Sequence, residues 1–233
     1  MALRIGLFQH HPDTRTEFAG TAELAYFGLS NWWMSTFTKA ERAHIEEFSR
    51  PHDAPPGSGP LTAQRRASAF SSAAGLLTAL AGSLRNRAED RTLAMRLLAK
   101  AEERAKAEVD VLALHMVYQE TIRLHLRWRD DFPEGLDLLF GACYKQIAIA
   151  PDVAHVFRQQ RPDQPLPTHA GFQVMAGLLE KDESYAQAIE MCKQARLQGW
   201  SGNWTWRIGS LARKLSQRGN PVQNMSRSGL GPL

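Results

Sequence analysis

Cysteine is scarce in this sequence: Cys143 and Cys192 are the only two among 233 residues, and neither belongs to a Cys-x-x-Cys pair. This scarcity argues against a disulfide scaffold and against a zinc site. Long apolar runs are also missing, since no stretch approaches the roughly 20 residues that a membrane-spanning helix needs. The N-terminal "MALRIGLFQHH" has only a very short apolar stretch and no small-residue cleavage site, which argues against a signal peptide. We therefore expect a cytoplasmic protein without a membrane span.

Acidic residues are absent after Glu190, although the whole chain contains 24 of them. Seven basic residues come after that position, and because the net charge of the chain is +4, the part up to Glu190 sums to about −3. A basic end on a mildly acidic body is found in proteins that contact nucleic acid or acidic partners. It is also found where a tail is simply solvated, so charge alone leaves both interpretations open.

Familiar catalytic and nucleotide-binding motifs are missing as well, since the sequence has no P-loop, GxGxxG, HExxH or GxSxG. His10 and His11 are adjacent, but neighbouring imidazoles in a flexible segment seldom complete a metal site. Glu41 and His44 have the spacing of a di-iron bundle, yet no second Glu-x-x-His accompanies them. We expect no metal and no cofactor.

The remaining titratable candidates are placed on predicted helices. His115 and His125 share one helix, but ten residues leave them roughly 80° apart, so we expect each in the core or in a groove rather than in a ligand pair. Cys143 and Cys192 are predicted to be small buried hydrophobes in mid-helix positions, which do not activate a thiol. We therefore expect no catalytic residue and infer that the chain is not an enzyme.

Helical patterns account for most of what is present. Thr38 and Glu41 have capping-box spacing and predict a helix that ends before Pro51. The stretch "PHDAPPGSGP" (51–60) predicts a loop. Further helices are expected over 62–87, from a cap at Asp90 to 107, over 108–128, from Pro133 to Pro151, from a cap at Thr168 to 181, over 185–195, and over 204–218.

These patterns predict an all-α protein with three parts. The first is an N-terminal extension (1–60) with one capped helix, which packs against the first pair of helices in the second part. Its aromatic residues Trp32, Trp33 and Phe37 are expected in the core, although they would also suit a contact with another subunit. The second part is a helical domain (61–218), and the third is a disordered tail (219–233).

Small residues recur at a fixed spacing. In "YAQAIEMCKQA" (185–195), Ala188, Cys192 and Ala195 lie on one helix face, where a large residue would be usual. We infer that another helix packs closely against this face. The same spacing returns at Ala94, Leu98 and Ala101.

The preceding helix of each pair has a small residue too. Gly82 lies twelve residues before Ala94, and Ala176 lies twelve before Ala188. The middle pair of helices shows the pattern weakly. Its register is set by Tyr144 with Ile147 or by Cys143 with Gln146, and the sequence leaves both open.

The arrangement resembles tetratricopeptide-repeat proteins, chiefly over "GFQVMAGLLEKDESYAQAIEMCKQARLQGW". The positions that match are Phe172, Ala176, Tyr185, Ala188 and Ala195, whereas Cys192 and Trp200 depart from the aromatic and proline of that pattern. The last repeat also resembles that of uncharacterised bacterial proteins of this kind. The resemblance covers about residues 75–218 and implies antiparallel helix pairs in a right-handed superhelix, closed by a C-terminal capping helix.

A repeat array of this kind implies a groove that binds a protein or peptide partner. Arginine and tyrosine are favoured at recognition surfaces, and the residues expected to face outward in the groove are Tyr118, Arg123, Arg127, Arg129 and Gln173. A solvated helix face would have the same composition.

The last helix offers a second surface. Trp200 and Trp204 are expected to cover the end of the array. Aromatic residues interleaved with basic ones are typical of single-stranded nucleic-acid contacts, and the candidates are Trp206, Arg207, Arg213, Lys214 and Arg218. The leading hypothesis is therefore a non-catalytic scaffold or adaptor, and the alternative is a nucleic-acid-associated protein.

Overall fold

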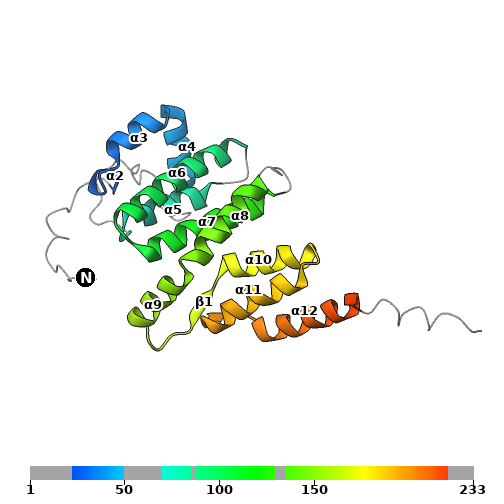
Figure 1. Ribbon diagram of the computed structural model, residues 1–233. Coiled ribbons are helices and arrows are strands. Elements are labelled where there is room, and N and C mark those ends of the chain that lie inside the picture. The colour runs from blue at the N-terminus through cyan, green and yellow to red at the C-terminus, as the bar shows by residue number, and fades with distance from the viewer. Residues whose placement is uncertain (1–22, 50–69, 85–87, 130–134, 220–233) are drawn as a thin grey trace, which may run out of the picture. The chain divides into compact units, whose positions relative to one another are not determined.

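The structure, a computed structural model, describes residues 23–49, 70–84, 88–129 and 135–219 (Figure 1). Helices make up most of these residues, so the all-α prediction is confirmed at that level. The chain divides into two compact units, residues 1–97 and 98–233. The predicted boundary near residue 60 and the predicted tail after Gly219 lie outside the described residues.

The first unit consists of short helices and the first half of a longer one. They are α2 (Glu23–Tyr26), α3 (Ser30–Thr36), α4 (Lys39–Ser49), α5 (Ala73–Ser83) and the part of α6 (Ala88–Ala107) up to Leu97. Trp33, Phe37 and Ile45 are buried together with the apolar face of α5. The expected core packing of Trp33 and Phe37 is therefore confirmed.

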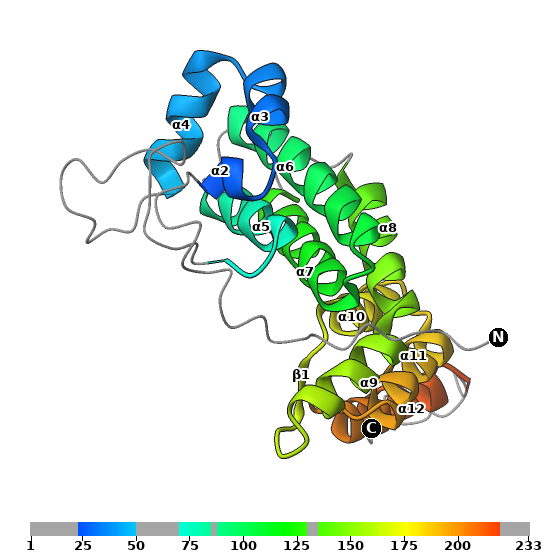
Figure 2. The ribbon, with the colours of Figure 1, turned by 90° about the vertical axis from the view of Figure 1, so that its left-hand side faces the viewer.

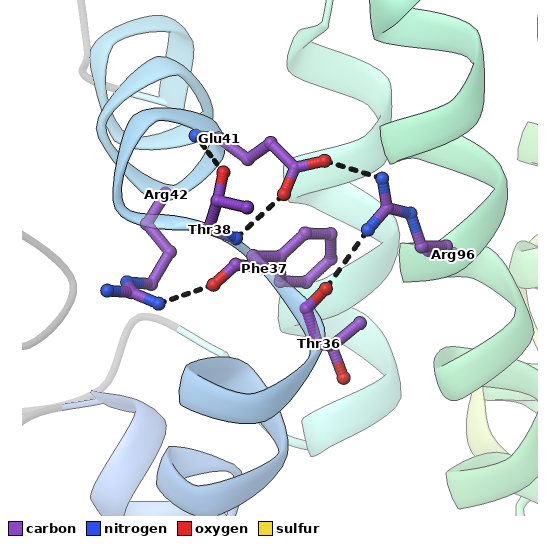
Figure 3. A network of polar contacts seen from close by, with 6 residues as sticks. All are labelled: Thr36, Phe37, Thr38, Glu41, Arg42 and Arg96. Atoms are coloured by element: carbon purple, nitrogen blue, oxygen red, sulfur yellow. Dashed lines mark hydrogen bonds and ion pairs between the residues drawn. The ribbon is translucent and has the colours of Figure 1, made fainter.

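The capping box that the sequence predicts at the start of α4 is present (Figure 3). The Thr38 amide donates to Glu41 Oε2 at 2.7 Å, and the Glu41 amide donates to Thr38 Oγ1 at 3.3 Å. Arg96 of α6 joins this network, with its Nη2 2.6 Å from Glu41 Oε1 and its Nη1 3.0 Å from the Thr36 carbonyl oxygen. The backbone hydrogen bond from Thr38 and the contact with Arg96 lower the pKa of Glu41, so the network favours its charged form.

Two predicted helix starts in this unit are wrong. The helix expected over 62–87 begins only at Ala73, because Ser72 is extended and its Oγ caps the helix by accepting from the Gly75 amide at 3.1 Å. It ends at Ser83, and residues 62–69 and 85–87 lie outside the described residues. Asp90 does not cap α6, which already begins at Ala88. Instead Asp90 is buried in the first turn, 2.6 Å from His44 Nε2, because a long-range partner takes its carboxylate.

The second unit begins with residues 98–107 of α6 and continues through six helices and two very short strands (Figures 1 and 2). These are α7 (Val111–Trp128), α8 (Gly135–Ala148), α9 (Ala150–Gln160), β1 (Leu166–Thr168), α10 (Ala170–Lys181), α11 (Tyr185–Leu197), β2 (Trp200–Ser201) and α12 (Trp204–Gly219). Helix α7 packs on α8, α10 packs on both, and α11 lies between α10 and α12.

Three boundaries in this unit differ from the predictions, two for local reasons and one because a tertiary partner takes part. Helix α7 begins after Asp110, which accepts from the Ala113 amide at 2.9 Å. The helix expected to run to Pro151 ends at Ala148, and Pro151 lies in the first turn of the next helix, α9, where its missing N–H leaves no hydrogen bond unmade. His169, not Thr168, caps α10, because Thr168 is taken up by β1, which pairs in parallel with β2.

The small-residue face of α11 is buried as predicted. Ala188, Cys192 and Ala195 are fully covered in a core that also contains Ala176 of α10 and Leu211 of α12. Small side chains at these positions let the backbones of neighbouring helices approach closely.

Of the two registers left open for the middle pair of helices, the structure has the one that Cys143 and Gln146 set. Cys143 and Gln146 are buried, whereas Tyr144 is 60% exposed. Cys143 is a covered free thiol, as expected for a small core residue. Within the described residues, no helix combines the length and the apolar character that crossing a membrane requires.

Candidate binding groove

Helix α12 is held by its apolar face and leaves the opposite face to solvent. Trp204 and Leu211 are buried against α11, and Ile208 is partly buried beside them. The Trp204 indole also donates from Nε1 to the Trp200 carbonyl oxygen at 2.7 Å, which ties the start of the helix to β2. Both tryptophans are buried, as expected.

Charged side chains bridge from α12 to α10. Glu180 of α10 accepts from Lys214 Nζ at 2.7 Å and pairs with Arg207 Nη2 at 3.2 Å. Hydrogen bonding to Lys214, supported by Arg207, lowers the pKa of Glu180. The bridging guanidinium of Arg207 lies close to Gly177, where an added Cβ would come within 3.3 Å of Nη2. Glycine at this position makes room for the Arg207 head group.

An open pocket of about 540 Å³ lies between α10, the turn before α12, and α12 itself. Its lining residues are Gln173, Glu180, Gly202, Asn203, Trp204, Trp206, Arg207 and Ser210. Trp206 is 70% exposed and offers a large apolar surface, while Gln173 and Asn203 carry amides that both donate and accept hydrogen bonds. This combination suits recognition of a chain with polar backbone groups and an apolar side chain.

The structure brings together predicted residues from both candidate surfaces. Gln173, expected in the groove, and Trp206 with Arg207, expected on the basic surface, line the same pocket. Lys214 and Arg218 lie further along α12 and pair with Glu180 and Glu183. Arg213 is exposed and has no ion pair within the part of the chain that the structure describes.

The predictions for α7 are only partly consistent with the structure. Arg123, Arg127 and Arg129 are exposed as expected, and Arg123 pairs with Glu120 one turn before it. Tyr118 was expected to face outward, and this is wrong because its side chain is only 4% exposed.

The burial of Tyr118 follows from the packing of one stripe of α7. It lies on the stripe of α7 that also carries Ile122 and His125, both of which are buried. Its hydroxyl donates to Glu102 Oε1 of α6 at 3.1 Å, and burial beside that carboxylate raises the pKa of the phenol. Tyr118 is therefore a packing residue with a satisfied hydroxyl.

Sequence reasoning missed Asn203, Glu180 and Ser210 as pocket residues. The only signal for Asn203 was the "GWSGN" break before the last helix. Glu180 and Ser210 gave no signal at all, because their role arises from the approach of α10 and α12, which are far apart in sequence.

Metal ligands do not gather in the described part of the chain. Among those residues, no three histidine, cysteine, aspartate or glutamate side chains come together as a metal site would need. Glu41 and His44, the pair with di-iron spacing, are bonded to Arg96 and Asp90 respectively.

The chain has no detectable relatives of known function or structure. No protein-family model matches it, and no curated protein and no solved structure shows significant similarity to it.

Proposed function

We propose that this protein is a non-catalytic scaffold or adaptor that binds a protein or peptide segment in the pocket between α10 and α12. The pairs α7/α8 and α10/α11, with α12 as a closing helix, would form a right-handed tetratricopeptide-like array. In support, α10 packs against both helices of the preceding pair, and the small-residue faces lie at the contacts between helices.

The observation that carries the proposal is the exposed Trp206 at the edge of the pocket. A tryptophan that is 70% exposed beside polar amides is the kind of residue that dominates binding energy at protein interfaces. Gln173 and Asn203 lie in the same pocket and supply hydrogen-bond partners for the main chain of an extended segment.

The alternative, a nucleic-acid contact, has weaker support. It needs cations that are available to neutralise phosphates. Arg207 and Lys214 already share the carboxylate of Glu180, and Arg218 pairs with Glu183. Only Arg213 among the basic candidates on α12 lacks an ion pair within the described residues.

The test is a selection of random displayed peptides on the full chain, followed by affinity measurements on the peptides recovered. We expect Trp206→Ala to weaken binding of the selected peptides at least about tenfold, since loss of an aromatic anchor typically costs about 2 kcal/mol or more. The matched control is Leu197→Ala, because Leu197 is 81% exposed on α11 and lies outside the pocket.

Equal affinities for the wild type and Trp206→Ala would contradict the proposed pocket. A labelled single-stranded oligonucleotide supplies the other arm. If it binds tightly, weakens steeply with salt, and loses affinity in Arg213→Glu, the nucleic-acid alternative takes the place of the scaffold.

A further inference from the structure

Two histidines and a tryptophan from three separate elements meet in the core beside the pocket. The rings of His115 (α7) and Trp200 (β2) are stacked, with centroids 5.6 Å apart and an interplanar angle of 6°. His169, the cap of α10, meets Trp200 edge-on at 4.7 Å and His115 at 5.1 Å. All three side chains are buried.

The hydrogen bonds of His169 require a neutral ring. Its Nδ1 accepts from the Phe172 amide at 3.3 Å, so that nitrogen must keep its lone pair free of a proton. Protonation would place an N–H on Nδ1, opposite another N–H, and would remove the cap of α10. Neither His169 Nε2 nor His115 Nδ1 has a hydrogen-bond partner among the described residues.

In the described part of the chain, no carboxylate supports an imidazolium in this pair, and the Gln146 backbone, which favours the charged form of His169, is outweighed by burial. Within the described residues, no carboxylate bonds to either ring. The surrounding core contributes the thiols of Cys143 and Cys192, whose pKa values burial raises. Outside the core, the exposed Arg158 of α9 donates to the Gln198 carbonyl. These groups are neutral or positive.

Burial disfavours the charged form of both rings more than stacking on Trp200 could favour it. It lowers the pKa of His115 to about 4, and burial together with the charge of His115 lowers the pKa of His169 to about 3. From an ordinary value near 6.5, this disfavours each charged ring by a factor of several hundred or more. Stacking of a charged ring on Trp200 would favour the charged form by only about 2- to 30-fold.

Trp200 connects this cluster to the wall of the pocket. Its carbonyl oxygen accepts from the Trp204 indole at 2.7 Å, and its strand β2 pairs with β1. The next residues, Gly202 and Asn203, and then Trp204 itself, line the pocket. Gly199, directly before Trp200, has a φ of +82°, a backbone conformation that glycine adopts without strain.

We propose that His115 and His169 form an acid-sensitive latch, which holds Trp200, β2 and the start of α12 in place while both rings are neutral and releases them when the rings are protonated. The latch acts on the pocket wall whether the ligand of the pocket is a peptide or another molecule. Acidification would therefore loosen the site before the unit as a whole unfolds.

The test is hydrogen exchange of the full chain without ligand, at about pH 7 and about pH 5.5, with intrinsic exchange rates corrected for pH. We expect protection of the amides in β2 and the first turns of α12 to fall by about tenfold for each imidazole that an open state can protonate. Amides in the middle of α7 and α8 should remain better protected than these at both pH values, because they exchange only when the whole unit unfolds.

Two variants separate the latch from other effects of acid. His169→Asn keeps a side-chain acceptor at the cap but cannot be protonated, and His115→Phe keeps the stacked ring. Each should reduce the pH effect on β2 and α12 by about tenfold. His155→Asn is the control, because His155 is exposed on α9.

Three results would overturn the latch. The first is equal protection of β2, α12 and the middle of α7 and α8 at about pH 5.5, since this would mean global unfolding alone. The second is a pH effect that both His169→Asn and His115→Phe leave intact. The third is a response of His155→Asn equal to theirs. Because the measurement needs no ligand, its outcome is independent of whether peptide binding is found.

Discussion

At the scale of single residues, the end of α6 contains an unusual choice. Val109 has a φ of +54° and is 88% exposed. The Asp110 amide donates to the Ala105 carbonyl at 3.0 Å and the Val109 amide to the Lys106 carbonyl at 3.2 Å, which is the Schellman pattern that usually places glycine here. A β-branched residue in this conformation is strained and has no packing to offset the strain.

We therefore expect Val109→Gly to stabilise the protein by about 0.5–1 kcal/mol, because relief of the left-handed strain exceeds the added entropy of the unfolded chain. Urea unfolding of both chains measures this. Gly199→Ala should destabilise the protein, because alanine would have to keep the left-handed φ of +82° and its Cβ would lie 2.8 Å from Arg158 Nη2. A destabilised Val109→Gly would show that the valine side chain makes a contact that its exposure conceals.

At the scale of elements, the start of α4 shows how a local motif is joined to a distant helix. Thr38 and Glu41 satisfy each other's amides within one turn. The same carboxylate receives Arg96, and the Arg96 guanidinium lies 5.2 Å from the centroid of the Phe37 ring (Figure 3). The local box therefore also orients α4 on α6 within the first unit.

Thr38→Ala should cost about 1 kcal/mol of the free energy of unfolding, because the Glu41 amide loses its acceptor at the cap. Thr36→Ala is a matched control, since Arg96 contacts the carbonyl oxygen of Thr36, which this substitution keeps. Chemical denaturation of both variants gives the comparison. An equal effect of the two substitutions would mean that the box contributes nothing beyond generic side-chain loss.

The element scale also explains why the outward prediction for Tyr118 on α7 is wrong. The sequence of α7 is apolar on more than one face, so Tyr118 could be assigned outward or inward from spacing alone. The deciding partner, Glu102 on α6, is sixteen residues away. The helix period specified that Tyr118, Ile122 and His125 share a stripe, but only packing decided which stripe is covered.

At the scale of the whole molecule, buried histidines link stability to pH. His115, His125 and His169 all lie in the second unit, and burial lowers the pKa of each. In the unfolded chain they return to about 6.5. Below that value the unfolded state binds protons that the folded state does not, so the stability of the fold decreases as the pH falls.

We expect the free energy of unfolding to drop between about pH 6.5 and pH 5 by about 1.6 kcal/mol for each histidine that stays neutral in the folded state. Urea midpoints over this pH range measure the drop. The pKa values of Glu102 and Glu180 are lowered below the usual 4.5, so the stability that these carboxylates contribute is lost only under more acidic conditions.

His155→Asn should leave this pH dependence unchanged, because His155 is exposed. His169→Asn should reduce the drop in the free energy of unfolding by the contribution of one histidine. Midpoints that do not change over the same pH range would contradict the burial of these rings in the folded protein.

What the sequence by itself determined is what depends on neighbours within a turn or two. The helical period, the capping box at Thr38 and the small-residue face of α11 are all set by local spacing. Ends of helices were less predictable, because Asp90 pairs with the distant His44, and because pairing of β1 with β2 takes up Thr168 and leaves the cap of α10 to His169.

Only the tertiary structure decided the site. Gln146 is buried because its amide bridges the Gly171 amide, at 2.7 Å, and the His115 carbonyl. Glu180 and Arg207, which line the pocket and bridge α10 and α12, are 27 residues apart. Such partners are brought together by burial of apolar surface, a long-range and non-directional force that leaves no spacing in the sequence for the polar pairs it creates.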